Sequence, residues 1–515
     1  MTPSGPQGQA HLLVTGSLAQ QLVQVTGLFA MFAIVTVLAR RLSLAELGVY
    51  GLLTSLAGYL LLVQNAAGAA AVQGMAMARD GVARDTAFSS TVVLYCCAGA
   101  LGGALLALAG LAVSAPLELS AAVDDQAKLG ALVLGVVTLV GWPLTVFRDS
   151  LRAEQLFVPA AFTEIAALLA YLALVLGLAY GGADLFLVIG ASGSLPLLVG
   201  LGCLAVARAQ SLPHRLRPRL VNRQSMRGLT SVAGYLSLSE GAAGVIYVVN
   251  RALLGIFKSA GTVGLYEGPI RAHNLLRSLN AAVTVIALPT AASYRAEERP
   301  DRLAQLLLRG TRYTLALLVP LAVTGMVLSG PILEVWLGDT FREADVAMTI
   351  LLGHWLVNGC SGLLIAILVG VGNARLVAGY SIAVAVGNVV LAVALIPSLG
   401  LEGVALATSV PYLALFPVLV RMALKAAAVP VTRLAREGFI PALSLGLVLA
   451  VLLAVLRFGT DPTTVPAVVG CAMAGLLGYW FTFYAVCLAA GERSLVRDVG
   501  RGLFPRKQTP GARRR

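Results

Sequence analysis

The sequence predicts an all-α integral membrane protein with about fourteen transmembrane helices, and two observations predict this fold class. Of its 515 residues, 58% are hydrophobic and 12% are charged, whereas about 25% of the residues of a soluble globular chain are charged. The apolar residues also recur in runs of about 18 to 25, long enough to cross about 30 Å of hydrocarbon as helices. One soluble core could not bury so much apolar surface, so the composition excludes a soluble enzyme with a membrane anchor.

The apolar runs fall into two groups on either side of a polar stretch. Six helices are expected near residues 12–39, 47–74, 87–113, 129–147, 158–180 and 185–206. Eight more are expected near residues 229–250, 268–292, 311–329, 346–371, 376–397, 402–424, 439–457 and 465–489. Because the N-terminus has no basic residue before its first apolar run, a cleaved secretory signal is not expected.

The charges predict the topology. An even number of helices places both termini on one side, and Lys and Arg concentrate in cytoplasmic connections. With both termini inside, the inner connections and the tail carry most of the 37 Lys and Arg. We therefore expect cytoplasmic termini. Topology and contact with anionic headgroups explain the net charge of +13 without nucleic-acid binding.

An internal repeat predicts how the helices are grouped. Gly48 and Tyr50, between the first two helices, recur as Gly264 and Tyr266 after the seventh helix. Both copies follow an odd-numbered helix, so they share one orientation, which is typical of two lobes related by an axis along the membrane normal. The expected domains are an N-lobe of helices 1–6 (1–207), a basic cytoplasmic linker (208–228), a C-lobe of helices 7–12 (229–425), helices 13–14 (426–490) and a basic tail (491–515).

Motifs for enzymatic chemistry are missing from the sequence. None of the four lysines follows a glycine, so a Gly-Lys-Ser/Thr phosphate loop cannot occur. The six cysteines lack C-x-x-C spacing, the four histidines form no H-E-x-x-H, and no serine lies in G-x-S-x-G. We therefore expect no catalytic residue, no metal site and no cofactor.

Polar residues within the expected helices are the candidates for function, because an ionisable group at membrane depth costs about 2.5–3.5 kcal/mol and faces protein or water. At helical spacing, these residues form one polar stripe on each of two consecutive helices. The stripe of the seventh helix consists of Ser237, Glu240, Gly244, Tyr247 and Arg251. The stripe of the eighth helix consists of His273, Arg277, Asn280 and Thr284, with Arg271 and Asn274 beside it. The first two helices carry the uncharged residues Ser17, Gln20, Gln21, Gln24, Thr54, Gly58 and Asn65. The first lobe is thus expected to contribute hydrogen bonds, and the second to contribute charge.

Two interpretations of the charged stripes remain open. At 1.5 Å per residue, Glu240 lies about 16 Å and Arg277 about 22 Å from the inner ends of their helices, so the two could form a buried salt bridge. Alternatively, Arg251, Arg271, His273 and Arg277 present a cationic surface to an anion, for which the planar guanidinium is suited. For Glu164 in the fifth helix we expect an ion pair within the first lobe rather than a role in proton coupling.

Three stretches resemble the polysaccharide-transporter branch of the multidrug/oligosaccharidyl-lipid/polysaccharide exporter (MOP) superfamily, the Wzx-type lipid-linked oligosaccharide flippases. These are residues 37–51, with Arg40, Arg41, Gly48 and Tyr50; residues 249–266, with Asn250, Arg251 and Gly264; and residues 371–408, with Gly372, Asn388, Pro397 and Gly403. The resemblance covers roughly residues 12–425. It implies a polysaccharide biosynthesis protein that moves undecaprenyl-pyrophosphate-linked oligosaccharide across the bacterial inner membrane by alternating access.

The resemblance also implies a cationic cavity lined by the first, second, seventh and eighth helices. The expected substrate-binding residues are Arg251, Arg271, His273, Arg277, Asn280, Glu240, Tyr247, Arg40, Gln24 and Asn65. Arg40 has an alternative as a helix-end residue that reaches toward the interface. This chain departs from the family because the stripes of its first two helices lack a mid-membrane charge. The expected partners are the lipid-linked substrate, the bilayer and polysaccharide polymerase or export machinery, and a monomer is favoured.

Three other functions are alternatives to this interpretation. A cation-coupled multidrug exporter of the same superfamily would need an acidic cavity, which the Arg-rich eighth helix disfavours. A lipid-II-type precursor flippase is close in chemistry but usually has more arginine in its first helix. A membrane glycosyltransferase or polymerase would need a larger outer loop, since no outer connection here exceeds about 20 residues by the expected boundaries.

Overall fold

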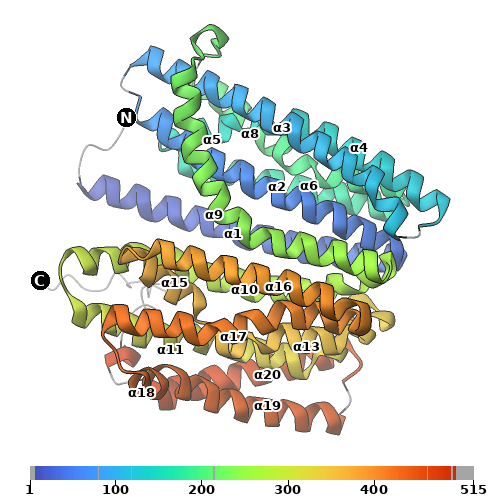
Figure 1. The fold of residues 1–515 in the computed structure, drawn as a ribbon, viewed down its shortest axis with the longest axis vertical. Coiled ribbons are helices and arrows are strands. Elements are labelled where there is room, and N and C mark those ends of the chain that lie inside the picture. The colour runs from blue at the N-terminus through green and yellow to red at the C-terminus, as the bar shows by residue number, and fades with distance from the viewer. Residues whose placement is uncertain are drawn as a thin grey trace, which may run out of the picture. The chain divides into compact units, whose positions relative to one another are not determined.

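The structure, a computed structural model, describes residues 6–78, 80–117, 119–212, 215–460, 462–488 and 491–494. The side chains of some further residues in these ranges, Glu240 and Tyr247 among them, lie outside the description. All regular structure in the described residues is helical (Figure 1). The main helices of the first half are α1 (Pro6–Arg41), α2 (Leu44–Ala76), α3 (Gly81–Leu117), α4 (Ala121–Leu144), α5 (Val146–Ala153), α6 (Phe157–Tyr180), α7 (Leu185–Ser192), α8 (Ser194–Ala209) and α9 (Arg223–Phe257). Those of the second half are α10 (Ala260–Ala296), α11 (Pro300–Val327), α12 (Ser329–Leu337), α13 (Asp345–Gly353), α14 (Trp355–Asn358), α15 (Ser361–Gly370), α16 (Ala374–Leu399), α17 (Leu401–Ala427), α18 (Val431–Leu434), α19 (Ile440–Thr460) and α20 (Val465–Thr482).

The helices confirm the predicted fold class. Within the described residues, eleven helices are long and apolar enough to cross a membrane, or up to thirteen if each of two bent pairs counts as one span. Each of these thirteen overlaps one expected run. The remaining expected run, 229–250, lies in α9, where many side chains are outside the description. The total of about fourteen therefore stays a prediction.

Several helix ends follow from local sequence. Ser43 accepts a hydrogen bond from the backbone of Glu46, and the Glu46 carboxylate accepts one from the backbone of Ser43, so a capping box begins α2. Asn222 and Ser225 form the same arrangement at the start of α9. Pro300 begins α11, where the missing N–H costs nothing because the first helical N–H groups have no partner within the helix.

The chain forms two compact units, which are described separately. The first comprises Met1–Leu275, Leu333–Leu351 and Arg375–Leu415. The second comprises Leu276–Ile332, Leu352–Ala374 and Phe416–Arg515. Helices α10, α12, α13, α16 and α17 contribute residues to both units. The predicted division into lobes on either side of 208–228 stays a prediction.

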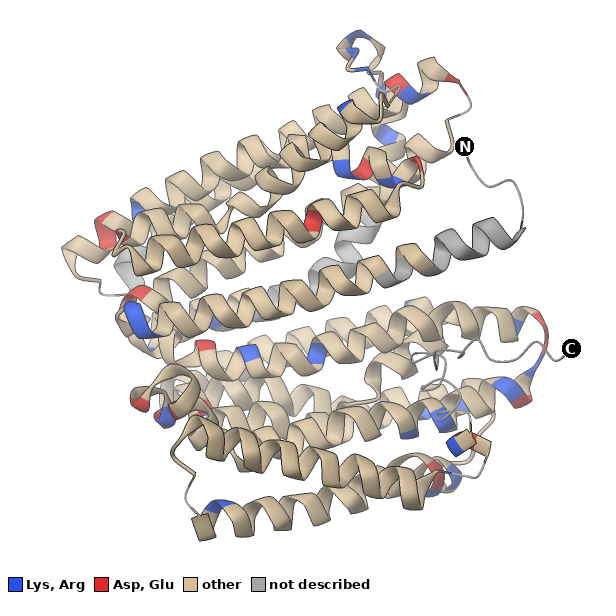
Figure 2. Cartoon of the chain, turned by 180° about the vertical axis from the view of Figure 1, so that it is seen from behind, with Lys and Arg blue, Asp and Glu red and all other residues tan. Residues whose placement is uncertain are grey.

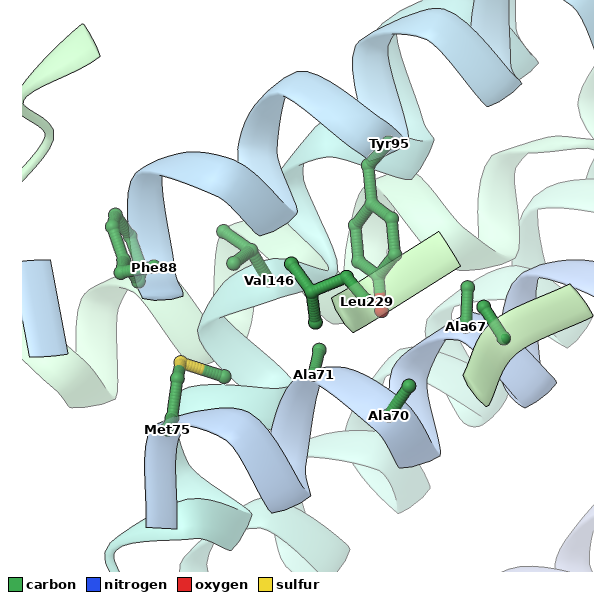
Figure 3. Close-up of a cluster of buried hydrophobic side chains, with 9 residues drawn as sticks. Ala67, Ala70, Ala71, Met75, Phe88, Tyr95, Val146 and Leu229 are labelled. Carbon is green, nitrogen blue, oxygen red and sulfur yellow. The ribbon is translucent and has the colours of Figure 1, made fainter. Parts of the chain in front are cut away.

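Helices of the first unit approach one another closely through glycine. A Cβ built on Gly103 of α3 would lie 2.5 Å from the Gly135 carbonyl oxygen of α4, and the reverse distance is also 2.5 Å. In Figure 3, Tyr95 of α3 points into a cluster of buried side chains from α2, α3, α5 and α9, among them Ala71 and Val146. These contacts hold α2, α3 and α5 as one packed body.

The two copies of the sequence repeat meet each other. A Cβ on Gly48 of α2 would lie 1.9 Å from the Ala260 carbonyl oxygen of α10, and one on Gly264 would lie 2.1 Å from the Leu44 carbonyl oxygen. Ala260 follows Leu44 by the same 216 positions as Gly264 follows Gly48. The contact is therefore reciprocal, as expected of two segments related by a local twofold axis.

In the second unit, the C-terminal helices pack on α11. The Arg457 guanidinium of α19 donates to the Val327 carbonyl oxygen at 2.5 Å, and the Trp480 indole of α20 donates to the Ala316 carbonyl oxygen at 3.0 Å. A Cβ on Gly446 would lie 2.5 Å from a methyl group of Val319. The last two long helices are thus integral to this unit.

Candidate functional site

Three charged side chains of the first unit form a buried ion-paired group, here called the Arg-Glu-Arg trio. Arg251 of α9 donates from Nε to Oε1 of Glu267 at 2.7 Å. Arg271, one turn after Glu267 on α10, donates from Nε and Nη2 to Oε2 at 3.2 and 3.1 Å. The side chains of Arg251, Glu267 and Arg271 are 5%, 0% and 17% exposed. One carboxylate thus holds two guanidinium groups.

The neighbouring helix α2 makes room for the trio. A Cβ on Gly51 would lie only 2.4 Å from Oε1 of Glu267, so a larger residue could not occupy this position without displacing the carboxylate. Gly51 follows the close approach at Gly48 by three residues, which brings the same face of α2 toward α10. The repeat contact therefore also places the trio.

The trio carries a net charge of +1, because two arginines share one carboxylate. The Arg271 Nη1 has no hydrogen-bond partner among the described residues, and Arg271 is the most exposed of the three. Arg251 is buried and paired with Glu267, and its predicted contact with substrate stays a prediction. The geometry suits a group in which Arg251 and Glu267 position Arg271, and Arg271 offers N–H donors to an anion.

Glu267 was not among the predicted site residues. The sequence suggests a helix beginning at 268, which leaves Glu267 in an outer connection, whereas α10 begins at Ala260. Glu267 therefore lies two turns inside the helix. The run Ala260–Gly264 has few large apolar residues, so a hydropathy reading starts the helix too late.

A second group of charges lies where a cytoplasmic connection was expected. After Pro143 and Thr145 the helix continues as α5, which carries Arg148, Asp149 and Arg152. Val146 and Leu151 of α5 are buried in two apolar clusters. The span Ala121–Ala153 therefore extends beyond the run expected at 129–147, and it places charged side chains of the first unit in a helix rather than in a connection.

Both carboxylate oxygens of Asp149 accept hydrogen bonds within this group. Its Oδ2 accepts from the Tyr95 hydroxyl at 2.6 Å, and its Oδ1 accepts from Nε of Arg148 at 3.0 Å. Arg148 also donates from Nη1 to the exposed side chain of Asn65 at 3.4 Å. A Cβ on Gly68 of α2 would approach Asp149, Tyr95 and Arg148 to within 3.2–3.3 Å, so glycine keeps this space open.

Arg152 connects α5 with α6 and α1. Its Nη2 donates to Oε1 of Glu164 at 2.7 Å and to Oε1 of Gln20 at 3.3 Å. The expected ion pair of Glu164 within the first lobe is thereby confirmed. Gln24, one turn after Gln20 on α1, is exposed.

Two other predicted residues of the first unit contact backbone carbonyls. Arg40 donates from Nη2 to the carbonyl oxygens of Val335 at 2.8 Å and Trp336 at 3.3 Å, at the end of α12. His273 is buried, and its Nδ1 lies 3.4 Å from the carbonyl oxygen of Leu351. The structure thus gives both side chains a role in holding helices together, and their predicted contact with substrate stays a prediction.

The remaining predicted residues lie in the second unit or outside the description. Arg277 is exposed, and Asn280 is buried, where it donates to the Ser361 hydroxyl at 3.1 Å and accepts from the Gly362 N–H at 3.2 Å. The side chains of Glu240 and Tyr247 lie outside the described residues. The salt bridge between Glu240 and Arg277 therefore stays a prediction.

Most charged residues gather near helix ends, and few interrupt the helix bodies (Figure 2). Among the described residues, no group of three or more His, Cys, Asp or Glu side chains could hold a metal ion. The buried charges described above are arginine–carboxylate pairs, which bind by charge and hydrogen bonding.

Comparisons with known proteins confirm the resemblance drawn from the sequence. The chain is similar to the lipid II flippase MurJ in an inward closed conformation, with a TM-score of 0.70 and 15% identity over 94% of this chain and 100% of that chain. It is also similar to an inward-facing multidrug resistance MATE family transporter of the MOP superfamily, with a TM-score of 0.65 and 15% identity over 78% of this chain and 94% of that chain. At this identity the likeness establishes the fold.

A sequence relative and a family model add to the likeness of fold. The probable flippase AglR of Haloferax volcanii is 28% identical over 159 residues, which are 30% of this chain. The match spans 33% of that relative's length. The model of a family described as polysaccharide biosynthesis protein matches residues 37–346, more than half of the chain, and includes the repeat, the trio and the charges of α5. The chain therefore belongs to this family of polysaccharide biosynthesis proteins and has the fold of MOP-superfamily membrane transporters.

Proposed function

We propose that the protein is an alternating-access flippase for undecaprenyl-pyrophosphate-linked oligosaccharide, the repeat unit of a polysaccharide. It moves this substrate from the inner to the outer leaflet of a bacterial inner membrane, with both termini in the cytoplasm. Family membership supports polysaccharide biosynthesis, and the relative AglR is named a probable flippase. Polysaccharide polymerase or export machinery would receive the product.

The observation that carries the proposal is the net positive charge of the Arg-Glu-Arg trio inside a membrane-spanning segment. Ala260–Ala296, which holds Glu267 and Arg271, is one of the candidate spans. A lone excess cation at this depth is costly unless an anion offsets it. A pyrophosphate has this charge, and its oxygens can accept two parallel N–H donors from one guanidinium.

The trio suggests how binding and release are balanced. Glu267 holds Arg271 through Oε2 while the site is empty, so the guanidinium is positioned before substrate arrives. The pyrophosphate then accepts from the open Nη1, while the polyprenyl chain stays in lipid. Because Glu267 also repels the phosphate, binding remains weak enough for release once the site opens to the other side.

The proposal is tested by reconstitution of the purified protein in liposomes with a fluorescently tagged polyprenyl-pyrophosphate oligosaccharide. Appearance of the tag in the opposite leaflet is measured with and without an ion gradient. We expect movement by the wild type and a loss of at least tenfold in Arg271→Ala. Arg342→Ala is the matched control, since Arg342 forms an exposed pair with Glu334 and should keep the wild-type rate.

Two further substrates separate the alternatives. Movement of a peptide-bearing lipid-II-type precursor in place of the oligosaccharide would identify a precursor flippase. Export of a cationic dye, with no movement of either lipid, would identify a multidrug exporter and overturn the proposal. An equal rate in wild type and Arg271→Ala would remove the trio from the mechanism.

A further inference from the structure

The hydrogen-bonding groups around Arg152 are only partly used, unlike those of Asp149. Nε and Nη1 of Arg152 have no partner in the described part of the chain, and Oε2 of Glu164 has none either. The side-chain amide nitrogens of Gln20 and Asn65 likewise make no hydrogen bond there. Unused donors and acceptors thus lie beside one another on α1, α2, α5 and α6. We call Gln20, Asn65, Arg148, Arg152 and Glu164 the α5 cluster.

The α5 cluster is accessible although it belongs to membrane-spanning segments. The helices that carry it are all candidate spans, namely Ala19–Arg41, Leu44–Ala76, Ala121–Ala153 and Phe157–Tyr180. Arg152 is 26% exposed at its side chain, and Asn65 is exposed. Polar side chains of membrane-spanning helices avoid lipid, so we expect these exposed groups to face water or a ligand.

The charge of the α5 cluster differs from that of the trio. Arg152 is balanced by Glu164, and Arg148 by the adjacent Asp149, so the group has no excess charge for an anion. Sugar hydroxyls both donate and accept hydrogen bonds, and they need both kinds of partner at once. Open guanidinium and amide N–H donors next to an open carboxylate oxygen meet that need.

We propose that the α5 cluster binds the sugars of the lipid-linked substrate, as a subsite separate from the pyrophosphate contact of the trio. The proposal rests on the flippase function and assigns the neutral, hydroxyl-rich part of the substrate to this group. Asp149 positions Arg148, and its second carboxylate oxygen accepts a hydrogen bond from the Tyr95 hydroxyl, so we assign it no contact with sugar. Arg152, Glu164, Gln20 and Asn65 make the contacts.

The test compares two ligands that share one anchor. Binding of tagged polyprenyl-pyrophosphate oligosaccharide and of tagged polyprenyl pyrophosphate without sugar is measured on the purified full-length protein in detergent. We expect the wild type to bind the glycosylated ligand more tightly. Asn65→Ala and Gln20→Ala should each weaken this ligand by about five- to tenfold, the value of one hydrogen bond, and leave the bare anchor unchanged.

Gln73→Ala is the matched control, because Gln73 is an exposed amide on α2 that is outside the cluster. It should change binding of neither ligand. Asn65 is exposed, so its replacement should leave the thermal midpoint of the protein unchanged, which is checked in the same samples. Glu164→Gln keeps the size of the side chain and should also reduce the preference for the glycosylated ligand.

The outcomes separate the subsite from the function on which it rests. Equal affinity of the wild type for both ligands would overturn the sugar subsite while the flippase proposal stands. Equal weakening of both ligands in Asn65→Ala and Gln20→Ala would also overturn it, since the cluster would then act on the anchor or on the fold. Failure of the wild type to bind either ligand would overturn both proposals.

Discussion

Replacement of Glu267 by glutamine should destabilise the protein by several times more than the same change at an exposed carboxylate. Glu267→Gln removes the negative charge that pairs with both Arg251 and Arg271, and turns an amide N–H₂ toward one of them. Arg251 and Glu267 are 5% and 0% exposed at their side chains. Removal of one partner from a buried ion pair costs about 3–5 kcal/mol. Because glutamine keeps one acceptor oxygen, we expect a value near the lower limit, about 3 kcal/mol.

The assay is unfolding of the purified protein in mixed micelles of increasing SDS content, followed by tryptophan fluorescence. Glu437→Gln is the matched control, because its partner Arg433 is 53% exposed and Glu437 itself 46% exposed. An exposed pair of this kind contributes about 0–1 kcal/mol. Arg271→Gln should cost less than half as much as Glu267→Gln, since Arg251 and Glu267 remain a neutral pair. If Glu267→Gln were as stable as the control, the trio would not hold α9 and α10 together.

Three further predictions concern packing and single hydrogen bonds. Gly264→Ala should abolish accumulation of folded protein, because its Cβ would lie 2.1 Å from a backbone carbonyl oxygen. Gly58→Ala is the control, since a Cβ at Gly58 meets open space, and the two variants are compared by expression yield and monodisperse elution. A normal yield of Gly264→Ala would refute the close approach. Tyr95→Phe should lower the free energy of unfolding by about 1.5–3 kcal/mol, the range for a hydrogen bond to a charged group, and an unchanged value would contradict the contact with the carboxylate. Trp336→Phe removes the hydrogen bond that the indole donates to the Thr36 hydroxyl at 2.6 Å, and should lower the free energy of unfolding by about 1 kcal/mol. A stabilised variant would contradict that contact.

The sequence was sufficient for the helices because hydropathy and length act locally. The bent pair Leu185–Ser192 and Ser194–Ala209 corresponds to the single run expected at 185–206. The repeat could also be identified from the sequence, because the close backbone contact at Gly48 and at Gly264 leaves no room for a side chain, so both positions need glycine. What the sequence could not provide is that these two copies touch each other, since a repeat fixes the relation of two segments but not their distance.

The charged groups were predicted less well than the helices. Arg251 and Arg271 were singled out, but Glu267 and the charges of α5 were assigned to connections, because a charge lowers the hydropathy of its window whether it is solvated or paired. Only the tertiary partners of Arg148 and Arg152, on α1, α2 and α6, explain why they lie inside a packed body. Glu164 was predicted correctly, because a lone acid in an apolar helix needs a cation nearby.

The central claim is that the protein moves a lipid by its pyrophosphate, and the most direct measurement changes that group alone. Liposomes containing the wild-type protein are given the same tagged oligosaccharide on polyprenyl pyrophosphate or on uncharged polyprenol, and transfer between leaflets is timed. We predict rapid transfer of the pyrophosphate-linked form and a rate for the uncharged form that equals protein-free liposomes. Equal transfer of both forms, or of neither, would contradict the account.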